Sequence, residues 1–127
     1  MKNLEISSDI HVTAVPVYLE RESSPILPKH VFAYHIEITN SGSDSVQLLR
    51  RHWEITDEGG EDYVVDGDGV IGQQPHIKPG KTHRYQSFCV LKGLTGSMQG
   101  WFELVKADGS QIKALIPKFI LTSHLLN

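Results

Sequence analysis

The chain has 127 residues, 39% hydrophobic and 21% charged, which suits one folded domain over residues 1–127 and excludes a disordered protein. Twelve Lys and Arg against fifteen Asp and Glu give a formal charge of −3, so there is no basic excess for binding nucleic acid. No stretch is apolar enough for membrane insertion and the first residues do not resemble a signal peptide, so we expect a cytoplasmic protein.

Short segments rich in β-forming residues follow one another along the chain, and clusters of turn residues separate them. The predicted strands span residues 10–21, 31–39, 46–56, 63–65, 83–91, 98–106 and 112–116. Asp108-Gly109 has the composition of a two-residue hairpin turn. We expect Pro117 to stop the last strand or to place it at a sheet edge.

The alternation of apolar and polar residues predicts which side chains are buried. The residues expected to face inward are Phe32, Tyr34, Ile36, Ile38, Leu49, Trp53, Ile55, Met98, Gly100, Phe102 and Leu104. This pattern turns Trp101 outward. An outward Trp is either covered by a loop or lies in a contact patch, because Trp is common at binding hot spots.

The fold class follows from the number and spacing of these segments. Seven or eight short antiparallel strands in a chain of 127 residues predict an all-β sandwich of the immunoglobulin or fibronectin type III-like kind. A small barrel is the alternative.

Residues 67–72 match G-x-G-x-x-G, but the two prolines that follow within residues 73–80 exclude the helix of a dinucleotide site. We interpret the motif as a tight turn or bulge in which Val70 and Ile71 anchor against the sandwich. The alternative is a nest of backbone amides that binds phosphate or a partner carboxylate. The candidate binding residues are Gly67, Asp68, Gly69, Val70, Ile71, Gly72, Gln73, Gln74 and Pro75, together with Trp101.

Seven histidines raise the question of a metal site. If the second and third predicted strands pair, His35 and Glu37 would lie opposite His52 and Glu54 on an outward face. A polar, solvent-facing surface is the default for such a strand pair, so His35 and His52 are weak metal candidates only.

Nothing in the sequence indicates catalysis. No Ser, His and Asp grouping has the spacing of an acyl-transfer triad, and Cys89, the single cysteine, has mostly apolar neighbours and is interpreted as a packing residue. We therefore expect no enzyme activity and no cofactor.

Four blocks in this order resemble the ApaG family. They are the run from Gly67 to Gly80, Tyr85-Gln86-Ser87 followed by Leu91, Gly96 to Phe102, and Ile116 to Leu121. The similarity extends over nearly the whole chain. Trp101 departs from the family pattern, in which Tyr is common, and keeps the aromatic character.

The resemblance implies a fibronectin type III-like domain that occurs alone in bacteria and within eukaryotic F-box proteins and a DNA polymerase-interacting protein. In those larger proteins the domain is a protein-interaction module. It also implies an association with cobalt tolerance and magnesium efflux, and with a gene for diadenosine tetraphosphate hydrolase nearby.

These observations predict a non-catalytic module that binds a protein partner, whose identity stays open. A homodimer is a second form of association that the sequence leaves open. The alternative is a phosphate or nucleotide binder that uses the Gly67–Gly72 loop and belongs to diadenosine tetraphosphate metabolism.

Overall fold

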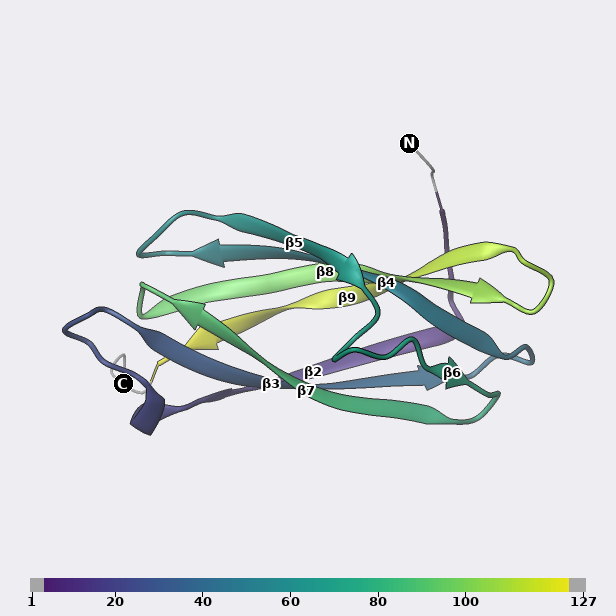
Figure 1. Ribbon diagram of the computed structural model, residues 1–127, viewed down its shortest axis with the longest axis horizontal. Helices are drawn as coiled ribbons and strands as arrows, with labels where there is room; N and C mark the ends of the chain where they lie inside the picture. The colour runs from purple at the N-terminus through teal and green to yellow at the C-terminus, as the bar shows by residue number, and fades with distance from the viewer. Residues whose placement is uncertain (1–3, 124–127) are drawn as a thin grey trace.

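The computed structural model describes residues 4–123 and consists almost entirely of strands (Figure 1). The strands are β1 (Glu5–Ile6), β2 (Ile10–Tyr18), β3 (His30–Asn40), β4 (Val46–Asp57), β5 (Tyr63–Asp68), β6 (His76–Ile77), β7 (Thr82–Leu91), β8 (Thr95–Lys106) and β9 (Gln111–Thr122). One short 3-10 helix, η1, covers Glu20–Glu22. No helix within residues 4–123 is long and apolar enough to cross a membrane.

The strands form two sheets, which confirms the all-β sandwich. The large sheet has the order β1-β9-β8-β4-β5, with β6 also paired to β4, and the small sheet has the order β2-β3-β7. All pairs are antiparallel except β1 with β9. The long strands of both sheets run along the long axis of the molecule (Figure 1).

Alternating side chains from both sheets fill the space between them, as the sequence predicts. Trp53 on β4 packs edge-on against Tyr34 of the small sheet and Phe102 of its own sheet, with ring centroids 5.4 and 6.4 Å apart. Such edge-to-face pairs add to the free energy gained by burying the rings. The fully buried side chains around them include Phe32, Ile36, Ile38, Leu48, Met98 and Leu104.

The predicted inward position of Leu49 is wrong. The pairing of β4 with β8 shifts register between Leu48 and Arg50, so Leu49 lies in a β-bulge. A bulge adds one residue to one strand and reverses the alternation that follows it. Leu48 is therefore fully buried before the bulge, and Arg51, Trp53 and Ile55 face inward after it.

Pro117 does not stop the last strand, because β9 continues to Thr122. Proline lacks the N–H that a sheet ladder needs, so it is tolerated at edges and bulges. Both conditions hold here: β1 pairs only with Ile112 and Lys113 of β9, and the β8–β9 register shifts between Met98 and Gly100, opposite Pro117.

The two lateral sides of the sandwich differ. On the closed side, β2 of the small sheet packs against β9 of the large sheet. On the open side lie the edge strands β5 and β7. Within the described residues, these two strands pack against each other much less than β2 and β9 do. Side chains rather than backbone therefore line the opening between β5 and β7.

Candidate functional site

The glycine motif forms the end of β5 and a tight hairpin beyond it. Val70 and Gln73 exchange backbone hydrogen bonds of 2.8 and 3.0 Å. Between them, Ile71 and Gly72 have φ values of 47° and 71°. Two successive residues with positive φ inside such a pair define a type I′ turn. The tight turn expected from the sequence is therefore present.

The hairpin is fastened to the bulged part of β4. The Gly69 amide donates to the Leu49 carbonyl at 2.8 Å, and the Gln74 side chain donates to the same carbonyl at 3.0 Å. The Leu48 amide donates to the Pro75 carbonyl at 3.0 Å. With the Val70 and Gln73 bonds, three amides within residues 69–73 are already used within the chain, so a phosphate nest would have to use others.

Gly67 and Gly69 are required for different reasons. Gly69 has a φ of 63°, and a Cβ there would lie 2.1 Å from the Gln73 carbonyl oxygen. Gly67 faces inward beside Arg51, and a Cβ there would lie 2.8 Å from two guanidinium nitrogens. Gly67 makes room for the Arg51 side chain, whereas Gly69 provides the positive φ that the backbone turn needs.

Val70 is buried as expected, but the predicted anchoring of Ile71 is wrong. Its side chain is 61% exposed at the tip of the turn. A type I′ turn directs its two central residues away from the strands that it connects, so only Val70 reaches the core.

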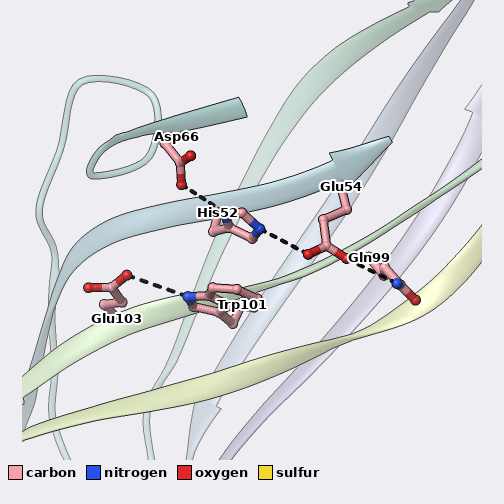
Figure 2. Close-up of polar contacts among 6 residues, drawn as sticks. All are labelled: His52, Glu54, Asp66, Gln99, Trp101 and Glu103. Carbon is pink, nitrogen blue, oxygen red and sulfur yellow. Dashed lines mark hydrogen bonds and ion pairs between the residues drawn. The ribbon is translucent and has the colours of Figure 1, made fainter. Parts of the chain in front are cut away.

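Trp101 lies on the outer face of the large sheet, where neighbouring side chains rather than a loop cover it. The His52 ring stacks on it with centroids 3.9 Å apart, and the Lys113 ammonium lies 4.5 Å from its ring centre. Its indole N–H donates to Glu103 at 3.4 Å (Figure 2). The indole is only half-buried, so part of it remains open to a partner.

Carboxylates hold His52 at both ring nitrogens (Figure 2). Nδ1 lies 2.7 Å from Asp66 and Nε2 lies 3.1 Å from Glu54, whose other oxygen accepts from Gln99. Burial alone would lower the pKa of His52, but the hydrogen bonds and charges of Asp66 and Glu54 outweigh it and raise the pKa. The hydrogen bonds from His52 and Gln99 lower the pKa of Glu54.

The predicted grouping of His35 with His52 is wrong. Their strands do not pair: β3 belongs to the small sheet and β4 to the large sheet. His35 lies opposite Val15 and Gln86, while His52 lies opposite Asp66 and Trp101. The turn between β3 and β4 crosses from one sheet to the other, so the two rings face away from each other. No group of three or more potential metal ligands occurs within residues 4–123.

One surface was not anticipated from the sequence. The outer face of the small sheet is apolar at the end where β2 finishes and β3 begins, and we call this surface the apolar face. Its exposed members are Val15, Val17, Phe88 and Val90, which surround the buried Val31 and Ala33. Register places Val17, Ala33 and Phe88 in one cross-strand row.

Comparison with known proteins decides the family. The family model described as the ApaG domain matches residues 20–106. The chain belongs to the ApaG family. Protein ApaG of Methylobacterium sp. (strain 4-46) is 46% identical over 88% of this chain and 86% of the relative. Protein ApaG of Bdellovibrio bacteriovorus is 45% identical over 92% of each chain.

Solved ApaG-type structures have the same fold. The crystal structure of a Bordetella pertussis protein described as ApaA has a TM-score of 0.88 and 37% identity, over 96% of this chain and 98% of that one. A second crystal structure, of a structural genomics target, has a TM-score of 0.87 and 37% identity, over 94% and 90% of the two chains.

In this ApaG domain, the predicted site residues fall into two groups. Asp68 and Trp101 share the outer face of the large sheet, connected by Arg50, which pairs with Asp68 at 2.6 Å and lies opposite Glu103. The hairpin from Gly69 to Pro75 lies instead beside the bulge of β4.

Two features were missed by the sequence reasoning. Arg51 is in phase with the inward-facing Trp53 and Ile55, but no pattern in the sequence indicates that its guanidinium lies beside Gly67. The apolar face did carry a signal, because Val15 and Val17 are apolar residues at the outward positions of β2.

Proposed function

We propose that this ApaG chain is a non-catalytic module that binds a protein partner through the apolar face. The observation that carries the proposal is the row of Val17, Ala33 and Phe88 with its neighbours on a surface that strand alternation ordinarily leaves polar. Contiguous exposed apolar patches of this kind mark interaction sites.

The surroundings of the apolar face indicate what kind of partner fits it. At one end the Glu37–Arg84 ion pair crosses the sheet, and at the other the loop before β3 exposes Ile26 and Leu27 by 93% and 73%. A partner with an apolar centre and a polar border on one side matches this arrangement. Phe88 would be the central anchor, since it is 58% exposed on an edge strand.

The state of the titratable side chains supports a non-catalytic role. His52 is held by carboxylates at both nitrogens, so neither nitrogen is available to a substrate. Burial raises the pKa of the Cys89 thiol, which disfavours the thiolate that a nucleophile needs. In this proposal, any contribution to cobalt tolerance or magnesium efflux is indirect and passes through the partner.

The test is partner capture followed by affinity measurement with purified proteins. Replacing Val15 and Val17 together by Thr keeps β-branched side chains of similar size and makes the face polar. We expect partner affinity to fall by about tenfold or more.

Val64→Thr is the matched control, because Val64 is 57% exposed on β5, away from the apolar face. It should leave affinity within about twofold. Equal loss in both variants, or no loss in the double variant, would contradict the proposal. Trp101→Ala measures any contribution of the opposite face.

A further inference from the structure

The open side of the sandwich contains a cleft of about 370 Å³ between β5 and β7. This volume lies within the range of small-molecule sites. Aromatic and apolar side chains form most of the lining, with Tyr34, Trp53, Tyr63, Val65, Ser87 and Phe88 among them. Small-ligand sites typically combine such walls with few polar groups, so the polar groups present here indicate what ligand would fit.

Among residues 4–123, Arg51 is the only charged residue that lines the cleft. Its Nη1 donates to the carbonyls of Asp68 and Gly69, both at 3.0 Å. None of the ion pairs within residues 4–123 involves Arg51. A guanidinium has five N–H donors, so the donors on its other nitrogens remain for a ligand.

The glycine motif positions this guanidinium. Two of its nitrogens lie where a side chain at position 67 would begin, and the carbonyls that hold it belong to the next two residues of the motif. Gly67 therefore lets the Arg51 guanidinium lie against the edge strand β5, beside the cleft that Arg51 lines.

The other titratable groups that line the cleft, Tyr34, Tyr63 and Cys89, are neutral at pH 7. Burial raises the pKa of Tyr34, of Tyr63 and of the Cys89 thiol. The hydroxyl of Tyr85, two residues from Ser87 on the same inward face, is buried and makes no hydrogen bond to the described residues. A single fixed positive charge among neutral groups matches a monoanion better than a phosphate dianion.

We propose that this cleft binds a small carboxylate that carries an apolar group, with Arg51 receiving the carboxylate and the aromatic walls receiving the apolar group. Arg and carboxylate form paired, charge-assisted hydrogen bonds, which gain strength where water is partly excluded. The ligand is either a free acid or the C-terminal carboxylate of a peptide. This proposal goes beyond partner binding by the apolar face, which meets the cleft at Phe88 and Val90 but contributes neither Arg51 nor the inward-facing walls.

Phenylacetate is the probe, and phenylacetamide is its neutral isostere. We expect phenylacetate to shift the backbone amide resonances of Gly67 and Ser87 in a saturable titration with a Kd on the order of millimolar. Phenylacetamide should bind at least about tenfold more weakly. A short peptide ending in Phe, tested with free and amidated C-terminus, distinguishes the peptide source from the free acid, and inorganic phosphate tests the dianion.

Two adjacent arginines provide the matched variants. Arg51→Gln should weaken phenylacetate binding by at least about tenfold. Arg50→Gln should change it by less than about twofold, because Arg50 pairs with Asp68 on the outer face. Gly67→Ala should also weaken binding, because the added methyl displaces the guanidinium.

Thermal melting confirms that each variant is folded. Equal binding of phenylacetate and phenylacetamide to the unmodified chain would overturn the proposal, and so would equal losses in the Arg50 and Arg51 variants. The Val15 and Val17 double variant should bind phenylacetate normally, so failure of this site and failure of the apolar face are separate results.

Discussion

At the scale of single residues, Ile71 is in a backbone conformation that β-branched residues rarely adopt. Its φ is 47°, which costs such a residue about 1–2 kcal/mol relative to the right-handed region. Its side chain is 61% exposed, so the free energy gained by burying it offsets little of that cost. Asn and Gly are the residues that type I′ turns favour, since both accept positive φ.

We predict that Ile71→Asn raises the free energy of unfolding by about 1 kcal/mol, because the turn conformation is retained and its steric cost removed. Thermal melting should show a midpoint about 4 °C higher. Gly72→Ala, at the neighbouring position with φ of 71°, should have the opposite sign. A less stable Ile71→Asn variant would show that the exposed isoleucine contributes more than its backbone costs.

The protonation of His52 makes the stability of the fold depend on pH. Its folded pKa is raised by Asp66 and Glu54, so the charged ring stabilises the fold. The contribution is fully present below the unfolded value of about 6.5 and is lost as pH rises through the folded pKa.

We predict that His52→Gln destabilises the protein more at pH 5.5 than at pH 9, by about 0.5–1 kcal/mol, since the partners are partly exposed. Denaturant unfolding at both pH values measures the difference. Asp66→Asn keeps the ring and should reduce the pH dependence. The same destabilisation at both pH values would mean that the ring acts only by packing on Trp101.

At the scale of elements, alternation predicted most strands and their buried faces, because each long strand buries one face on the core. Alternation failed where a side chain's position depends on a bulge or on which strand pairs with which. The bulge at Leu49 removed that residue from the inward face and left Leu48 buried instead, and the crossing between sheets separated His35 from His52. Neither a bulge nor a strand partner is encoded in the period of one segment, so the cleft at Arg51 could not be predicted from the sequence.

The hairpin after β5 gives a prediction at this scale. Gly69→Val should lower the free energy of unfolding by about 3 kcal/mol or more, because the residue has positive φ and its Cβ would overlap the Gln73 carbonyl. Asp68→Asn should cost less than about 1 kcal/mol, since the ion pair that it removes, with Arg50, is exposed to solvent and therefore weak. Urea denaturation of both variants compares them. If Asp68→Asn were the more damaging change, the loop would act through side-chain chemistry.

At the scale of the whole molecule, the Asp57 carboxylate joins two loops that are distant in sequence. It accepts hydrogen bonds from the amides of Lys92 at 2.8 Å, Gly93 at 2.9 Å and Gly59 at 3.0 Å. Burial alone would raise the pKa of Asp57, but these hydrogen bonds lower it. Because β7 belongs to the small sheet and β8 to the large one, the carboxylate fixes the chain where it passes between sheets.

Asp57→Ala should lower the free energy of unfolding by about 3 kcal/mol at pH 7, since it leaves three amides, one buried and two partly buried, without their acceptor. The loss should shrink as pH falls through the lowered folded pKa of Asp57, where the carboxylate of the unmodified protein is protonated. Unfolding at pH 7 and pH 3 measures this, with the exposed Glu58→Ala as control. A loss that does not change with pH would exclude the charge as its cause.

The open side of the sandwich has a consequence for dynamics. Among the described strands, β5 is paired only to β4, and β7 only to β3, so either edge can open locally while the pairs β4–β8 and β8–β9 remain intact. Amides on β5 should therefore exchange with solvent through small openings, and those on β8 only through unfolding of the whole domain. The side that contains Arg51 can widen in this way for a ligand larger than the resting cleft, at a cost far below that of global unfolding.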